Sequence, residues 1–430
     1  MRKNKVKGID MKLSKEKIDF SKNFIWNALG TGLNSFNSLF FLIIVTRING
    51  KELAGMFSIG FAIGLILYTV GLYSGRVCHV TNTDSNVTDK DYVLNRIFTC
   101  ILMMILALII VTIRNYSGIK LNIVLLICLF KALEAFSDVL YGIMQKKECL
   151  YKSGQSLTLK SVLGLLFFFV TNIITKDLVL SIIVLNFINI IIILFWDIRI
   201  INRIKNVSLL GEMSSKTEII GILKREFFVF VNSFAGVYIL NSSKYAIDVY
   251  LTETFQAVFG YIMMPATVMI LFTQFILLPF LNKFKELYKN GKIKEFEILG
   301  RKIKSSVLAF GFLAVIIAYL IGPEVLSFIY GVNLLEYRGY LMIIIASYIL
   351  YSISYVNLVI LTTMRKTFIQ FVVYVISMLV AFIVSNILVK NYGILGATIA
   401  IAITLTVQFV LYIMITKLIM YKERIRLETK

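Results

Sequence analysis

Residues 197–225 read DIRIINRIKNVSLLGEMSSKTEIIGILKR, and they form the longest break in hydrophobicity after the N-terminal tail. On both sides of this break the 430-residue chain is strongly apolar. Hydrophobic residues make up 58% of it, charged residues only 16%, and the mean hydropathy is +0.84. Such a composition leaves too little polar surface to cover a soluble globule of this size. The sequence therefore predicts a protein embedded in a membrane.

Six apolar stretches lie on each side of the break, and each is long enough to cross about 30 Å of hydrocarbon, which takes roughly 20 residues. They are expected at about 24–46, 52–74, 92–113, 119–143, 154–174, 177–196, 226–250, 254–282, 303–325, 338–363, 368–388 and 393–419. The pattern predicts an all-α integral membrane protein of about 12 transmembrane helices in two six-helix bundles, as in transporters with repeated halves. A weak internal echo supports the repeat, since a shift of 204 residues places Asn37-Ser38 on Asn241-Ser242.

The same stretches predict the domain boundaries. The expected parts are a basic tail at 1–22, an N-terminal six-helix bundle at 23–198, a linker at 199–222, a C-terminal six-helix bundle at 223–420 and a second tail at 421–430. Both tails and the linker are expected on the cytoplasmic side.

The 45 lysine and arginine residues predict this orientation. When residues near the ends of a span are counted with the adjoining connection, 36 lie on the side of the N-terminus and 7 on the other side, and the remaining two, Lys131 and Lys244, lie within spans. Cytoplasmic loops carry the excess of Lys and Arg, so both termini are expected in the cytoplasm, with the chain in the cell membrane. The formal charge of +21 then reflects basic loops against anionic membrane lipids, and no nucleic-acid partner is expected.

The connections are too short for a catalytic or nucleotide-binding domain, and they contain no P-loop. None of the four cysteines pairs with another at metal-ligand spacing, and the sequence has one histidine. We therefore expect a transporter and not an enzyme, without a metal or a cofactor. The run Asp89-Lys90-Asp91 is interpreted as a solvated charge cluster.

Polar side chains inside several predicted spans share one helical face at 100° per residue. Seven of them are the candidates for binding a transported molecule: Asn34, Lys131, Glu134, Asp138, Asn241, Lys244 and Asp248. A charge near mid-membrane costs roughly 2.5–3.5 kcal/mol on insertion scales, so it normally faces protein or trapped water.

Two interpretations of these charges stay open. Lys131 with Glu134 and Lys244 with Asp248 have i,i+3 and i,i+4 spacing, so they can form internal ion pairs that only neutralise each other. Alternatively, the two lysines line a polar cavity and meet an anionic, hydroxyl-rich cargo. Both can hold together, because a carboxylate often fixes a cation of this kind.

Several motifs are distributed along the chain in a characteristic order: KNFIWN (22–27), TRING (46–50), AGMFS (54–58), GPEVL (322–326), YG (330–331) and YGILGATIA (392–400). Together they resemble the O-antigen and capsule repeat-unit flippases (Wzx-like) of the multidrug/oligosaccharidyl-lipid/polysaccharide exporter superfamily. The resemblance covers essentially the whole chain, and its specificity lies in the order and spacing of the motifs.

The resemblance implies a MATE-like arrangement of two bundles around a central cavity that opens alternately to the two membrane faces. It implies export of a polyprenyl-pyrophosphate-linked oligosaccharide from the inner to the outer leaflet, with a polysaccharide polymerase and other assembly proteins as possible partners. Arg47 and Arg76 match motif positions, where a gating or structural role is favoured.

Two other functions are weighed. A drug/cation antiporter of the same superfamily commonly has an acidic residue in its N-terminal bundle, and Glu134 and Asp138 keep this alternative open. A membrane polysaccharide polymerase or ligase is disfavoured, because the external loops are short and lack clustered Arg, His or Asp.

Overall fold

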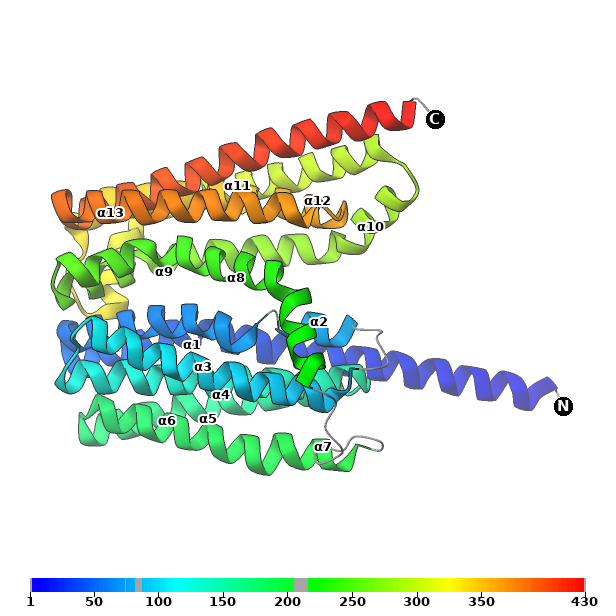
Figure 1. Cartoon of the computed structure of the whole chain (residues 1–430), viewed down its shortest axis with the longest axis horizontal. Helices are drawn as coiled ribbons and strands as arrows, with labels where there is room; N and C mark the ends of the chain where they lie inside the picture. Colours follow the sequence, from blue (N-terminus) through cyan, green and yellow to red (C-terminus); the bar gives the residue numbers. More distant parts are fainter. Residues whose placement is uncertain (1, 74, 82–86, 205–215, 429–430) are drawn as a thin grey trace. The chain divides into compact units, whose positions relative to one another are not determined.

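The computed structural model describes residues 2–73, 75–81, 87–204 and 216–428, and no strand occurs within these ranges. The all-α fold class predicted from the composition is therefore confirmed (Figure 1). Most of the central connection, residues 205–215, lies outside the described residues. The predicted boundaries of the tails and the linker stay predictions.

The helices before the central connection are α1 (Arg2–Leu72), α2 (Gly75–Thr81), α3 (Asp89–Ile113), α4 (Gly118–Lys146), α5 (Leu150–Thr175), α6 (Leu178–Ile192), the π-helical turn η1 (Ile193–Ile198) and α7 (Arg199–Arg203). Those after it are α8 (Lys216–Tyr250), α9 (Glu253–Leu277), the 3₁₀ turn η2 (Leu278–Phe280), α10 (Leu281–Lys289), α11 (Ile293–Tyr330), the 3₁₀ turn η3 (Leu335–Tyr337), α12 (Arg338–Thr363) and α13 (Thr367–Glu428).

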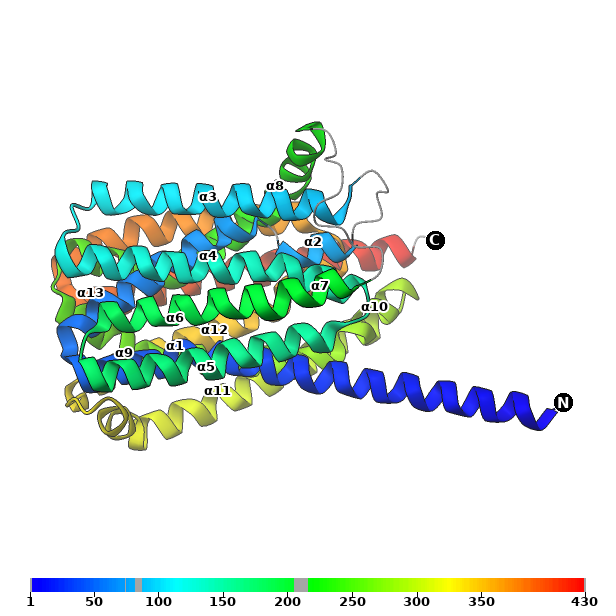
Figure 2. The same ribbon diagram turned by 90° about the horizontal axis from the view of Figure 1, so that it is seen from below.

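The chain divides into two compact units. The first unit comprises Met1–Asn49 and Ile63–Phe227, and the second comprises Gly50–Ala62 and Phe228–Lys430. In the first unit α4 packs against α3 and α6, and α6 packs against α5, while in the second unit α12 packs against α9, α11 and α13. Within each unit the long helices run side by side (Figure 2). Each unit is thus a helical bundle in its own right.

Two of the helices are interrupted by glycine. Gly50 in α1 has φ +88° and Gly393 in α13 has φ +58°, which are conformations that residues with a β carbon rarely adopt. The break at Gly50 separates the predicted spans 24–46 and 52–74, and the break at Gly393 begins the predicted span 393–419. Each of these two helices therefore contains two of the predicted spans.

Eight of the described helical segments are long and apolar enough to cross a membrane, and both interrupted helices are among them. The helices α4 and α8, which contain the predicted spans four and seven, are not in that group. Their polar and charged stripes lower the apolar content that a membrane helix normally has. The chain is a multi-pass membrane protein, and the exact number of twelve spans stays a prediction.

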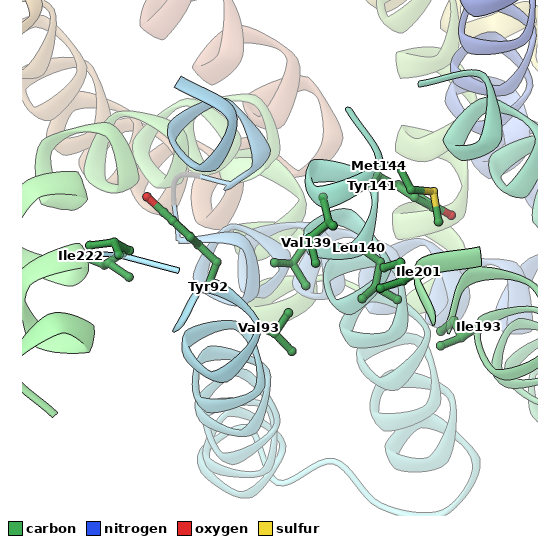
Figure 3. Close-up of a cluster of buried hydrophobic side chains, with 11 residues drawn as sticks. Tyr92, Val93, Val139, Leu140, Tyr141, Met144, Ile193, Ile201 and Ile222 are labelled. Atoms are coloured by element: carbon green, nitrogen blue, oxygen red, sulfur yellow. The ribbon is translucent and has the colours of Figure 1, made fainter. Parts of the chain in front are cut away.

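The end of the first unit near the central connection is closed by a hydrophobic cluster (Figure 3). Its side chains come from α3, α4, η1, α7 and α8: Tyr92, Val93, Val139, Leu140, Tyr141, Ile143, Met144, Ile193, Ile201 and Ile222, together with Val87 from the loop before α3. Burial of this apolar surface fixes α4 against α3 and α7, and it holds Tyr141 at the boundary between the cluster and the polar residues of α5.

The run Asp89-Lys90-Asp91 in the first turn of α3 is not a solvated cluster, contrary to its interpretation from the sequence. Asp91 is fully buried and closes a capping box with Thr88, in which each side chain bonds the other residue's backbone N–H. Asp89 contacts two other elements, with 3.0 Å to His79 Nε2 and 2.9 Å to Lys146 Nζ. These carboxylates therefore fix the start of α3.

Candidate functional site

The polar stripe of α4 begins with an ion pair between Lys131 and Glu134. The Lys131 Nζ lies 2.6 Å from Glu134 Oε2, and Lys131 is only 8% exposed. The same Nζ lies 5.0 Å from the centre of the Phe130 ring and 5.8 Å from that of Tyr68 on α1, within reach of cation–π attraction. The internal pair predicted from the i,i+3 spacing is therefore present.

Asp138, one turn further along α4, pairs with Arg96 of α3. Its Oδ2 lies 3.5 Å from Arg96 Nη2, and the arginine is 5% exposed. This ion pair thus joins α3 and α4 within the first unit.

The most deeply buried pair of the first unit joins Lys160 of α5 to Asp197 of η1. The Lys160 Nζ lies 2.6 Å from Asp197 Oδ2, 2.6 Å from Ser137 Oγ and 3.0 Å from the Tyr141 hydroxyl. That hydroxyl is in turn 2.8 Å from Ser156 Oγ. Asp197 is completely buried, so both charges of this pair are removed from solvent.

Lys160 and Arg96 were missed as candidates because both were counted with the basic connections that set the orientation. The signal that could have found Lys160 is its position, six residues into the predicted span 154–174. Asp197 was assigned to the central break, but it lies in a π-helical turn that continues α6. Turns of this type occur frequently at functional sites.

Among the described residues of the first unit, the buried cations Arg96, Lys131 and Lys160 are thus paired one to one with Asp138, Glu134 and Asp197. This balance means that each cation already has an opposite charge within 3.5 Å. An anionic ligand can use one of these cations only by sharing it with its carboxylate.

Lys244 of α8, in the second unit, is in a different situation. Its side chain is largely buried, and its ammonium has no hydrogen bond or ion pair with any described residue. Asp248 lies one turn further on, but no ion pair joins the two within the part of the chain that the structure describes. The predicted i,i+4 pair is thus not formed. The Asn241 amide turns back to its own helix and donates to Val237 O at 3.0 Å.

The face of α8 around Lys244 is fixed by short hydrogen bonds. Ser243 Oγ donates to Ala397 O at 2.8 Å, and the Ser385 hydroxyl donates to Ser242 Oγ at 3.1 Å. The Tyr245 hydroxyl donates to Ala62 O at 2.9 Å. These bonds hold the backbone of α8 in place on both sides of Lys244.

The remaining predicted residues lie elsewhere. Asn34 is half-buried on the first part of α1, and Arg47 is exposed near the end of that part. Arg76 on α2 is half-buried and packs beside Gly142 of α4, where an added β carbon would lie 3.4 Å from Arg76 Cγ. This close packing favours a structural role for Arg76.

No protein-family model matches the chain. A capsular polysaccharide biosynthesis protein, CapF of Staphylococcus aureus, is 25% identical over 409 residues, which cover 91% of this chain and 98% of that protein. This similarity therefore extends over both units.

Two solved structures share the fold at low sequence identity. The lipid II flippase MurJ in an inward closed conformation has a TM-score of 0.70 at 12% identity and covers 91% of this chain and 87% of its own. An inward-facing multidrug resistance MATE family transporter of the MOP superfamily has a TM-score of 0.64 at 13% identity and covers 94% of both chains. The chain thus has the fold shared by MurJ and the MATE transporter. Its similarity to a capsular polysaccharide biosynthesis protein over nearly the whole chain agrees with the resemblance that its motifs indicated.

Proposed function

We propose that this protein is a flippase for a polyprenyl-pyrophosphate-linked oligosaccharide repeat unit. It moves this cargo from the inner to the outer leaflet of the cell membrane by alternating access, with both termini in the cytoplasm, and so supplies surface polysaccharide synthesis. The similarity to a capsular polysaccharide biosynthesis protein over nearly the whole chain supports the proposal, and so does the fold shared with a lipid II flippase. The polymerase that uses the exported unit is the expected functional partner.

The observation that carries the proposal is that Lys244 is a cation without a hydrogen-bond or ion-pair partner among the described residues. A charge kept inside a membrane protein without a partner is costly, so it is retained where a ligand supplies the opposite charge. A pyrophosphate is such a ligand, because its oxygens accept charge-assisted hydrogen bonds from lysine. The amide side chains of Asn241 and Asn34 are suited to the sugars, and the lipid tail needs no polar partner.

Lys131 is proposed as the second cation for the same cargo. Its ion pair with Glu134 orients the ammonium, and a carboxylate that holds a cation does not prevent it from donating to a phosphate oxygen. Asp138 and Asp248 are proposed to position neighbouring groups. No residue is assigned a catalytic role, because moving the cargo between leaflets breaks no covalent bond.

A drug/cation antiporter is the second candidate, and the three carboxylates of the first unit favour it. These carboxylates are already neutralised by Arg96, Lys131 and Lys160, however. Lys244 would repel a cationic drug in the second unit. The charges therefore favour an anionic cargo.

The test is complementation of a deletion strain with Lys244→Met. We expect the deletion to abolish surface polysaccharide and to leave lipid-linked repeat units on the inner leaflet. Lys244→Met should insert normally yet restore little export, since losing a charge-assisted bond costs roughly 1.5–3 kcal/mol, or about tenfold to hundredfold in affinity. Lys390→Met, an exposed lysine of the same unit, is the matched control and should restore export fully.

Normal export by Lys244→Met at equal expression would contradict the role of Lys244. Normal surface polysaccharide in the deletion strain itself, in a host without a redundant transporter, would reject the flippase. If the deletion increased only sensitivity to cationic drugs, the antiporter would be the better assignment.

A further inference from the structure

The second unit contains a cavity of about 480 Å³ that none of the predicted cargo residues lines. It lies between α11, α12 and the last part of α13, near the end of the bundle where α12 ends and α13 continues to the C-terminus. These three helices pack against one another, and they run together through this part of the bundle in Figures 1 and 2. A volume of this size is typical of sites for small molecules, which span about 300–1,000 Å³.

The charges around the cavity are strongly unbalanced. Four basic side chains line it, namely Arg301, Lys304, Lys417 and Arg424, against the single carboxylate of Glu297. Glu297 is bound to Arg424 at 2.7 Å, so this pair is neutral. The other three cations form no ion pair or hydrogen bond with any residue that the structure describes. Lys304 and Lys417 also repel each other. An anion in the cavity would remove this repulsion.

Two buried polar side chains line the same cavity without partners. Asn357 of α12 is 0% exposed, and neither its Oδ1 nor its Nδ2 has a hydrogen-bond partner within the described chain. Thr416 of α13 is 5% exposed, and its hydroxyl is likewise unsatisfied there. Most buried polar groups in native proteins are hydrogen-bonded, so a cluster of exceptions needs an explanation. A ligand that offers several oxygen atoms would satisfy both groups.

The chemistry of the lining identifies the ligand class. Arginine and lysine together with amide and hydroxyl donors are the groups that bind phosphate oxygens. The apolar side chains of Ile413 and Met420 complete the lining, so the cavity can also hold the carbon atoms next to an esterified phosphate. We propose that this cavity binds a phosphate group, as a second anion site of the protein, with Lys304, Lys417 and Asn357 as its principal ligands.

This proposal does not rest on the flippase function. All of its residues belong to the second unit, and the cation proposed for the cargo, Lys244, does not line the cavity. The phosphate group bound in the cavity can belong to a soluble phosphate or to a lipid headgroup. The experiment therefore needs one arm for each source.

In the first arm, the detergent arm, the full-length protein is titrated in detergent with inorganic pyrophosphate, and binding is measured by calorimetry. In the second arm the protein is placed in nanodiscs of phosphatidylcholine with or without phosphatidic acid, and binding is measured as a rise in the thermal midpoint of unfolding. In whichever arm the wild-type protein binds the phosphate group, we expect Lys304→Gln/Lys417→Gln to weaken the binding at least tenfold. The control Lys302→Gln/Lys422→Gln removes the same charges from the same two helices at exposed positions outside the cavity, and it should bind like the wild type.

Asn357→Leu separates binding from folding. Because it removes two unsatisfied buried polar atoms, this variant should fold with a thermal midpoint at least equal to that of the wild type, yet bind severalfold more weakly. Binding in the detergent arm that Lys304→Gln/Lys417→Gln weakens would identify a soluble phosphate as the ligand of the cavity, and such binding only with phosphatidic acid would identify a lipid headgroup. No binding in either arm, or equal loss in the cavity and control variants, would overturn the proposal.

Discussion

The buried pair between Lys160 and Asp197 allows a direct test of what holds the first unit together. Lys160 is 7% exposed and Asp197 is completely buried, with 2.6 Å between Nζ and Oδ2. Asp197→Leu leaves the lysine charge buried with only the hydroxyls of Ser137 and Tyr141 as partners. Removing one partner of a buried ion pair costs about 3–5 kcal/mol, so we expect a large fall in the free energy of unfolding.

The double variant Lys160→Met/Asp197→Leu removes both charges and replaces them with apolar groups of similar size. Such a replacement is often neutral or stabilising, by about 1–4 kcal/mol. We therefore expect the double variant to be more stable than either single variant, which makes the two changes strongly non-additive. Thermal unfolding in detergent can be followed by tryptophan fluorescence, because Trp196, one of only two tryptophans, is adjacent to Asp197.

An exposed pair provides the matched control. Lys283 and Glu286 on α10 are 3.3 Å apart with about half of each side chain exposed, and replacing both with Gln should change the stability by less than about 1 kcal/mol. If the losses at Lys160 and Asp197 were simply additive, the pair would not stabilise the bundle through its opposite charges. That result would refute the reasoning.

Three further predictions address the cargo, the topology and the backbone. Lys131→Gln/Glu134→Gln should fold and insert, but its affinity for the cargo should fall by about tenfold to hundredfold, and export should fall with it. Wild-type export by this variant at normal expression would show that the two charges only neutralise each other. In a background without the four native cysteines, cysteines placed at 215 and 333 should react oppositely with an impermeant thiol reagent on intact cells. Labelling of position 215 from outside would overturn the predicted orientation. Gly393→Ala should lower the stability by about 1–2 kcal/mol from backbone strain alone, since no atom lies closer than 4.0 Å to the added carbon, whereas Gly339→Ala on α12 should be neutral or stabilising.

The parts of the fold that could be predicted depend on local composition. The apolar stretches located most of the long helices, and the two glycine breaks fall where the predicted spans meet. The helices α4 and α8 were also found, although their polar stripes keep them outside the group that is apolar enough by composition alone. Hydropathy therefore identifies the elements, but polar and charged side chains within a span weaken the signal in the helices that carry them.

The pairing of the charges was less predictable, for a physical reason. Helical spacing correctly indicated the pair of Lys131 with Glu134, but the same rule failed for Lys244 and Asp248. An i,i+4 spacing allows a contact without imposing it, since each side chain can point to another partner. The pairs of Lys160 with Asp197 and of Arg96 with Asp138 join different helices, so only the packing of the bundle reveals them.

Some buried cations have a carboxylate partner and others have none, and this difference separates the residues that stabilise the fold from those available to a ligand. In the first unit each of the buried cations Arg96, Lys131 and Lys160 has a carboxylate, so neutralising one member of a pair alone should lower the stability. In the second unit Lys244 has no such partner among the described residues, so removing its charge should preserve or increase stability. Removing the charge of Lys244 should therefore weaken the binding of its anionic ligand. A variant that becomes more stable and less active is the expected signature of a binding cation, and Lys244 is the position where this signature should appear.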